Sequence, residues 1–250
     1  MIQKQFVKNS DEIDLYVQVE GSEDALKNVI FVHGNGVDMH GDYFDAIVPV
    51  LIEHGYRTIR FDLRGCGQSK GKQEDGNFAT YARDVLDIVE WTKKEFIGDC
   101  YLIAHSMGCS VTAKAQPNGI IKAVLTGIPN SDSEFRVNNF KERILSKGGT
   151  FNENDISIYK HSNGRTQKIG HDYWRELRDF KAIEKTTEFA NKTPLLIIRP
   201  IDDQIVPNVG IEEYGMIPNA KLIKLPGNHQ FDNPKDQIEL FKTILDFFSE

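Results

Sequence analysis

The sequence predicts an α/β protein built on a mostly parallel β-sheet of about eight strands flanked by helices. Two observations lead to this fold class. Short runs rich in Val, Ile and Leu alternate with longer amphipathic segments, as expected when helices that connect parallel strands cover both faces of a sheet. The chain of 250 residues is also long enough to bury a large apolar core. We therefore expect residues 1–250 to form a single domain.

Eight segments have the pattern of β-strands. The first two alternate apolar and polar residues, and the other six are short apolar runs separated by longer segments. In chain order these segments are residues 2–7, 13–20, 29–32, 58–61, 100–104, 121–126, 195–198 and 222–225. The uninterrupted apolar character of the later runs favours strands that are buried on both faces.

Helices are expected between most of these strands. Apolar residues at helical spacing predict helices near residues 42–54 and 77–95, which should pack on the sheet. A third helix should begin at Ser106. A fourth is expected near Pro207 and a last one near Pro234, because proline is favourable in the first turn of a helix.

Residues 130–180 interrupt the alternation of strands and helices. This segment is polar, has no strong strand pattern and is too long for an ordinary connecting loop. We expect it to form a small helical cap, or lid, inserted after the sixth strand. Its aromatic residues Tyr159, Tyr173 and Trp174 either line a substrate pocket or form the core of the cap itself.

Composition argues against several classes of partner. The chain has 30 basic and 37 acidic residues, and its formal charge of −7 would repel a nucleic acid backbone. We find neither a secretory signal nor the ~18 consecutive apolar residues of a membrane span, so the expected location is the cytoplasm. The three cysteines form no CxxC pair, which argues against both a disulfide framework and a zinc site.

A strand-like run ends in a turn that presents a serine. The turn reads Ala104-His105-Ser106-Met107-Gly108 and is followed by a helical pattern. A sharp turn from a strand into a helix requires small residues on both sides of the serine, and it directs the hydroxyl away from the backbone at the helix N-terminus. Ser106 is therefore the candidate nucleophile. The alternative is a serine that only caps the helix.

A serine hydroxyl needs a base that removes its proton and a third group that orients the base. His229 lies in a loop between the last predicted strand and the last helix, and it is the candidate base. Asp202 and Asp203 follow the predicted strand 195–198. Because the carboxyl ends of parallel strands meet at one edge of a sheet, we expect all these residues to lie at the same edge.

In chain order these residues are serine, aspartate and histidine, and this pattern resembles the α/β-hydrolase superfamily, in particular its small esterases, monoglyceride-lipase-like and cinnamoyl-esterase-like members. The resemblance covers nearly the whole chain. In that family the acidic residue commonly precedes x-x-Val-Pro, which here selects Asp203, because Val206 and Pro207 occupy those positions, and leaves Asp202 as the alternative.

The resemblance also implies an oxyanion hole. His33-Gly34-Asn35-Gly36 is similar to the H-G-x-G loop of the family. Asn35 and Met107 would then donate their main-chain N–H groups to the developing negative charge on the substrate oxygen. The side chain of His33 is expected to hold the loop rather than to act in catalysis.

The stretch 61–69 is similar to a second recurring family segment, D-x-R-G-x-G-x-S, which we interpret as structural. Its glycines do not have the spacing of a nucleotide-binding loop. The adjacent His105 should not reach the Ser106 hydroxyl. Four further histidines, at positions 40, 54, 161 and 171, lack metal-binding spacing, so we expect no metal.

The expected function is that of a serine hydrolase of the carboxylesterase or lipase type, which cleaves a small or medium-sized ester through an acyl-enzyme and needs no cofactor. Thioester, amide or carbon–carbon bond cleavage by the same three residues are alternatives within enzymes. A non-catalytic ligand-binding protein of the same fold is an alternative of another class. The sequence does not indicate the oligomeric state.

Overall fold

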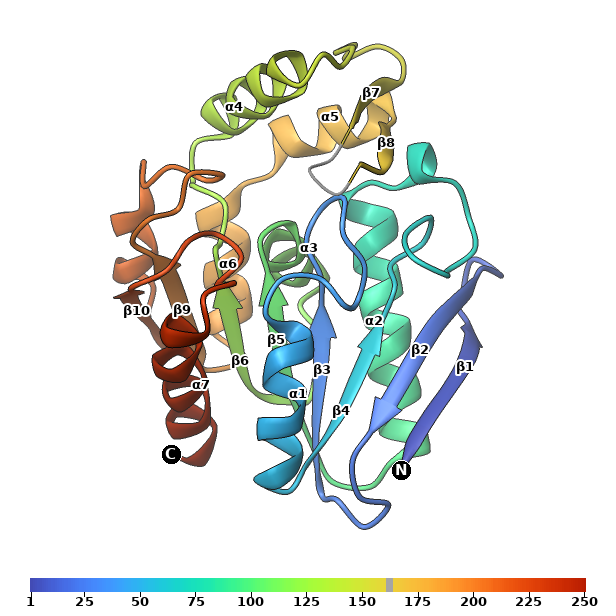
Figure 1. Ribbon diagram of the computed structural model, residues 1–250, viewed down its shortest axis with the longest axis vertical. Helices are drawn as coiled ribbons and strands as arrows, with labels where there is room; N and C mark the ends of the chain where they lie inside the picture. Colours follow the sequence, from blue (N-terminus) through green and yellow to red (C-terminus); the bar gives the residue numbers. More distant parts are fainter. Residues whose placement is uncertain (161–163) are drawn as a thin grey trace.

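A computed structural model describes residues 1–160 and 164–250 and confirms the predicted fold class. An eight-stranded sheet forms the centre of the molecule (Figure 1), with the strand order β1-β2-β4-β3-β5-β6-β9-β10. Only the pairs β1–β2 and β2–β4 are antiparallel. The strands are β1 (Ile2–Lys8), β2 (Asp14–Glu20), β3 (Lys27–Val32), β4 (Tyr56–Phe61), β5 (Asp99–His105), β6 (Ile120–Thr126), β9 (Leu195–Pro200) and β10 (Ala220–Leu225). Each of the eight predicted strands is present.

Helices cover both faces of the sheet (Figure 1). One face packs against α1 (Phe44–Glu53) and α7 (Pro234–Ser249), and the other against α2 (Phe78–Glu95), α3 (Met107–Ala115) and α6 (Ala182–Ala190). Side chains of a strand alternate between the two faces, and in β3 and β5 both sets are apolar and buried. Burial on both faces is the physical reason that these strands appear in the sequence as continuous apolar runs.

The helix expected near Pro207 is absent, so that prediction is wrong. Residues 201–210 form a loop, followed by a short 3-10 helix, Ile211–Met216. Two side chains compete with helix formation here, because Asp203 accepts hydrogen bonds from two backbone N–H groups of the loop and Asn208 accepts from the buried Arg199. Gly210, the last residue of this loop, has a left-handed φ of 67°, which is incompatible with a regular right-handed helix through this position.

The inserted segment, residues 130–180, lies beyond the carboxyl ends of the strands (Figure 1). It contains α4 (Ser133–Ser146), a hairpin of β7 (Ser157–Lys160) and β8 (Thr166–Ile169), and α5 (His171–Asp179). The hairpin corrects the expectation of a purely helical insertion. Arg136 holds the segment together, because its guanidinium donates to the carbonyl oxygens of Asn130, Ser131, Leu177 and Phe180 at 2.7, 2.8, 3.2 and 2.9 Å.

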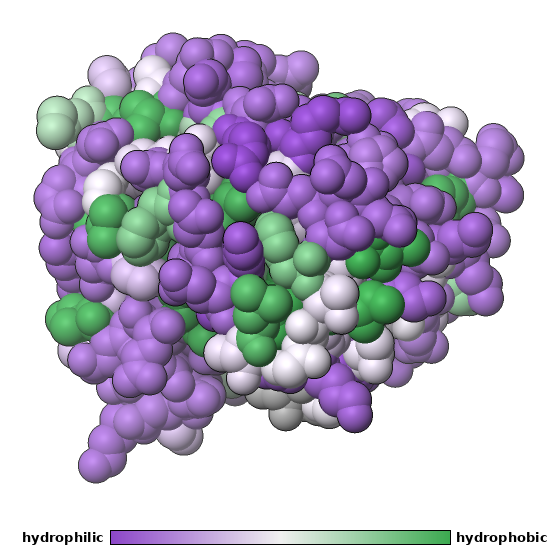
Figure 2. Space-filling view, turned by 90° about the horizontal axis from the view of Figure 1, so that it is seen from above, coloured by the Kyte–Doolittle hydropathy of each residue, from purple (hydrophilic) through white to green (hydrophobic). Residues whose placement is uncertain are grey.

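Seen from above, the molecule presents a mainly hydrophilic surface on which apolar residues form small, separate patches (Figure 2). The large apolar side chains are mostly inside, in the two clusters that flank the sheet. Within residues 1–160 and 164–250, each helix is too short or too polar to cross a bilayer.

Candidate active site

Ser106 lies at a strained turn between β5 and α3. Its backbone has φ 53° and ψ −122°, a conformation that L-residues rarely adopt and that costs about 1–3 kcal/mol. The surrounding structure enforces this turn, because the Ser106 N–H donates to the Thr126 carbonyl at 2.9 Å and its carbonyl accepts from the Cys109 N–H at 3.0 Å. The turn directs the side chain into a cavity above the sheet, as the strand–turn–helix motif predicts.

Small residues around Ser106 allow α3 to approach the sheet closely. A Cβ atom added to Gly108 would lie 2.3 Å from the Val32 carbonyl oxygen and 2.8 Å from that of His33. A Cβ atom added to Gly34 would lie 3.1 Å from the Cβ of Ser106. The lack of room for a side chain at these two positions therefore explains why the sequence has small residues around this turn.

The structure brings Ser106, His229 and Asp203 into one hydrogen-bonded chain. The Nε2 atom of His229 is 3.0 Å from the Ser106 Oγ, and its Nδ1 atom is 2.8 Å from an Asp203 carboxylate oxygen. His229 and Asp203 are buried. When Nδ1 donates its proton to the carboxylate, Nε2 is left free to accept the proton of the serine hydroxyl.

Asp203 is the carboxylate that reaches His229, whereas Asp202 is exposed. One Asp203 oxygen faces His229, and the other accepts from the N–H groups of Ile205 and Val206 at 3.0 and 2.8 Å. Burial acts to raise the pKa of Asp203, but the hydrogen bond and the charge of His229 and the Val206 N–H outweigh it, so its pKa is lowered. The carboxylate is therefore ionised near neutral pH.

Arg199 places a positive charge next to Asp203, a role that the sequence analysis did not predict. Its guanidinium is fully buried at the end of β9, and one nitrogen lies 3.4 Å from the Asp203 carboxylate. The same group donates to the carbonyl oxygens of Ile128 and Val206 at 2.8 and 2.6 Å. The strand-end position and the positive charge were visible in the sequence, but its partners are brought together only by folding.

His105 packs beside the three-residue chain without joining it. Its ring centroid is 4.7 Å from that of His229, while its Nδ1 is 2.9 Å from the Thr126 hydroxyl and its Nε2 is 3.7 Å from the Asp42 carboxylate. Gly127 accommodates both rings, since a Cβ there would lie 2.9 Å from His105 and 3.1 Å from His229. His105 therefore restricts the position of the His229 ring by packing against it.

We expect His105 to make the protein less stable in mild acid. Burial lowers its pKa to about 4, against the opposing effect of Asp42. In the folded protein the ring stays neutral down to about pH 4, but in the unfolded chain it takes up a proton below about pH 6.5, so stability is lost as the pH falls between these values. Between about pH 7.5 and 5 this group should lower the free energy of unfolding by about 2 kcal/mol.

Urea unfolding of the wild type and of His105→Asn at both pH values measures this contribution. The variant lacks the titrating ring, so its stability should fall less on acidification than that of the wild type. An equal loss in both proteins would show that His105 is not the group responsible.

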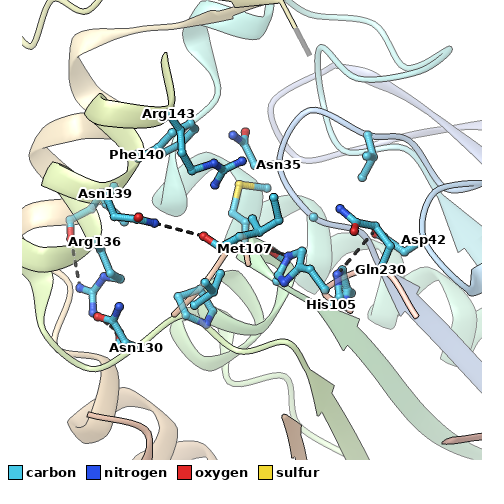
Figure 3. A pocket seen from close by; sticks show the side chains of 18 of the residues that line it. Asn35, Asp42, His105, Met107, Asn130, Arg136, Asn139, Phe140, Arg143 and Gln230 are labelled. Carbon is cyan, nitrogen blue, oxygen red and sulfur yellow. Dashed lines mark hydrogen bonds and ion pairs between the residues drawn. The ribbon is translucent and has the colours of Figure 1, made fainter. Parts of the chain in front are cut away.

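Asn35 and Met107 line the same cavity as Ser106 (Figure 3), as expected if their N–H groups face a substrate oxygen. The loop that carries Asn35 is held by His33, whose ring is fully buried. Its Nε2 accepts from the Leu63 N–H at 3.0 Å, so Nδ1 carries the proton and donates to the Gly34 carbonyl at 2.8 Å. His33 thus has the structural position that the sequence predicts.

Stretch 61–69 also supports loops around the cavity. The Asp62 carboxylate accepts from the N–H groups of Met39 and Gln68 at 2.9 and 2.7 Å. Arg64 forms a buried ion pair with Asp84, with a nitrogen–oxygen distance of 2.7 Å. These bonds join the segment to α2 and to the loop after β3, in agreement with a structural interpretation.

Of the three aromatic residues singled out in the inserted segment, only Tyr173 lines the cavity. Tyr159 and Trp174 pack with Phe140 in the aromatic core of the segment, and the Trp174 indole donates to the Ser157 hydroxyl at 3.0 Å. The prediction that Tyr159 and Trp174 contact the substrate is therefore wrong. Neighbouring residues of a helix point about 100° apart, so Tyr173 and Trp174 on α5 face different sides.

In the described part of the chain, no three His, Cys, Asp or Glu side chains are arranged to hold a metal ion. His40 lies 2.9 Å from Asp45, His54 contacts the carbonyl of Val50 at 2.8 Å, and His171 lies near Asp172. His161 lies outside the described residues.

The fold and this strand–turn–helix site are typical of the α/β-hydrolase fold, and comparisons with known proteins agree. Residues 27–144 match the family model of the alpha/beta hydrolase fold. The chain is 23% identical to a non-heme chloroperoxidase of Burkholderia pyrrocinia and to a bifunctional esterase/perhydrolase of Acinetobacter calcoaceticus, each over 89% of this chain and 91% of the relative. The solved structure of Est1E from Butyrivibrio proteoclasticus with ferulic acid has a TM-score of 0.76 and 22% identity, and the match covers 98% of this chain and 100% of that chain.

The chain therefore has the α/β-hydrolase fold. The family model matches residues 27–144, and the structural neighbour shares the fold over nearly the full length of the chain.

Proposed function

We propose that the protein is a serine hydrolase that cleaves a carboxylic ester of a small or medium-sized substrate through an acyl-enzyme. The observation that carries this proposal is the position of the His229 ring, whose two nitrogens lie 3.0 Å from the Ser106 hydroxyl and 2.8 Å from the Asp203 carboxylate. The similarity to a bifunctional esterase/perhydrolase adds support for ester chemistry.

In the proposed first half-reaction, the Ser106 Oγ attacks the ester carbonyl carbon while its proton passes to His229 Nε2. Asp203 remains ionised and stabilises the resulting imidazolium. The main-chain N–H groups of Asn35 and Met107 would stabilise the negative oxygen of the tetrahedral intermediate. Collapse of this intermediate breaks the ester bond, and His229 returns the proton to the departing alcohol.

In the second half-reaction, water attacks the acyl-enzyme by the same route. His229 takes a proton from the water, the new tetrahedral intermediate collapses, and the proton returns to Ser106 as the acid leaves. Ser106, His229, Asn35 and Met107 line one cavity, and Asp203 acts through its hydrogen bond with His229.

The inserted segment, residues 130–180, would act as a cap in this enzyme. Asn139 on α4 donates to the Ile205 carbonyl at 3.1 Å, within the loop whose N–H groups hold Asp203. The cap therefore contacts the loop that positions Asp203, and residues of its helices α4 and α5 line the cavity together with Ser106. Arg136, Asn139, Phe140 and Arg143 of α4 are labelled in Figure 3.

A fluorophosphonate probe tests the proposal directly, because it reacts covalently with an activated serine. We expect one equivalent of probe to bind to the native protein, to map to the peptide with Ser106, and to abolish hydrolysis of 4-nitrophenyl butyrate. Protein unfolded in urea should not react, since His229 and Asp203 are then dispersed. A native protein that takes up no probe and turns over no activated ester would refute the proposal and favour a ligand-binding function.

A further inference from the structure

Helix α4 presents basic side chains to the cavity above Ser106. Arg136, Arg143 and Lys147 are separated by seven and four residues, so they lie along one face of the helix. All three line the cavity. Of the described residues that line it, Asp42 is the one acid, and this carboxylate lies next to His105. The cavity therefore carries an excess of positive charge on its cap side.

The three basic residues differ in what they contact. Arg136 is occupied by four backbone carbonyl oxygens of the inserted segment and serves its structure. Lys147 is exposed at the C-terminal end of α4, where its ammonium lies 5.9 Å from the Tyr159 ring. Arg143 lies between them and is half-buried.

Arg143 has no carboxylate or carbonyl partner among the residues that the structure describes, and its guanidinium packs 5.5 Å from the ring of Phe140 on the same helix. In the close-up the side chain extends from α4 toward the part of the cavity where Asn35 and Met107 lie (Figure 3). Burial lowers its pKa, but an arginine stays charged at neutral pH. A half-buried cation that points into a cavity and has no hydrogen-bond acceptor among the described residues is available for a ligand.

We infer that Arg143 binds an oxyanion group, a carboxylate or a phosphate, that the ester substrate carries at a distance from its scissile bond. This inference rests on the proposed function and specifies its substrate class. A guanidinium matches the geometry of both oxyanions and can form two parallel hydrogen bonds with them. The apolar side chains of Phe140, Tyr173 and Leu177 line the same cavity and reduce the screening of such a pair by water.

Pairs of esters, of which one member carries a charged oxyanion group and the other is uncharged, test this inference. Mono-4-nitrophenyl succinate and its methyl ester place the carboxylate on the acyl side, and 4-acetoxybenzoate and its methyl ester place it on the alcohol side. A third pair, 4-acetoxyphenyl phosphate and phenyl acetate, tests a phosphate. We expect the wild type to prefer the charged member of at least one pair by roughly 10- to 100-fold in kcat/KM, the range for charge-assisted hydrogen bonds.

Variants of α4 assign the preference to one side chain. Arg143→Gln should abolish it and leave hydrolysis of the uncharged esters unchanged, which also shows that the variant is folded. Arg143→Lys should retain part of it. The matched control is Lys141→Gln, which removes a positive charge from the same helix at an exposed position that does not line the cavity, and it should keep the full preference.

Three results would overturn the inference while leaving the ester hydrolase proposal intact. The first is a wild type that shows no preference for the charged esters, and the second is a preference for them that survives in Arg143→Gln. The third is an equal loss of activity on charged and uncharged esters in that variant, which would indicate a role at the scissile bond instead. Failure of the wild type to hydrolyse any of the six esters would instead refute the proposed function itself.

Discussion

Replacement of Ser106 by alanine is expected to lower kcat for 4-nitrophenyl butyrate by about 10⁵- to 10⁶-fold, to near the rate of the unassisted reaction in the cavity. The change removes the Ser106 Oγ atom, which is the nucleophile of the proposed mechanism and lies at hydrogen-bond distance from His229 Nε2. Alanine keeps the backbone of the strained turn and the contacts of the neighbouring Gly108, so the fold should persist. Release of 4-nitrophenolate, followed at 405 nm or so, measures the rate.

Ser110→Ala is the matched control for this experiment. Ser110 lies one turn further along α3, is buried and does not line the cavity, so the same loss of a hydroxyl there should leave kcat within a few-fold of the wild type. Thermal unfolding of both variants checks that they are folded. Turnover by Ser106→Ala at the wild-type rate would show that another group carries the reaction.

Asp203→Asn is expected to reduce kcat by about 10⁴-fold, the second large effect. The orientation of this side chain is determined by the N–H groups of Ile205 and Val206, which require an oxygen at the Oδ1 position. The amide nitrogen of the asparagine would therefore face His229 and donate to Nδ1. The proton of the imidazole then moves to Nε2, where it blocks acceptance of the Ser106 proton.

Asp202→Asn separates this effect from a general loss of negative charge. Asp202 is adjacent in sequence but exposed, so its replacement should change kcat by less than a few-fold. Steady-state kinetics of both variants on the same ester decide between the two aspartates. A larger loss in Asp202→Asn than in Asp203→Asn would reverse the assignment of the triad acid.

The buried charges behind the triad explain why Asp203 needs this environment. Its carboxylate is removed from water, and burial by itself opposes ionisation. Hydrogen bonds from His229 and from two loop N–H groups compensate for the lost hydration, and Arg199 contributes a positive charge at 3.4 Å. A carboxylate held in this way is pre-oriented toward the imidazole, so no reorganisation is needed when His229 becomes charged.

Local patterns in the sequence were sufficient to predict the eight strands and the helices that begin near residues 42, 77, 107 and 234. Strands buried on both faces leave continuous apolar runs, and a sharp strand–turn–helix leaves small residues around Ser106, so both signals are encoded by neighbours in the chain. The same kind of local signal failed near Pro207, where hydrogen bonds of Asp203 to the loop N–H groups and of Asn208 to Arg199 compete with a helix.

The sequence by itself determined the fold class and placed Ser106, His229 and the two adjacent aspartates at one edge of the sheet, because the carboxyl ends of parallel strands, and the loops that follow them, meet there. The resemblance to a known family selected Asp203 over Asp202, and the folded chain brings Asp203 together with His229 and Ser106. Only the tertiary structure decided the surroundings: which aromatic residue of α5 faces the cavity, and that Arg143 of α4 points toward Asn35 and Met107. The residues concerned belong to segments that are distant in the chain, and their positions depend on how the inserted segment packs. The periodicity within one segment carries no information about that packing.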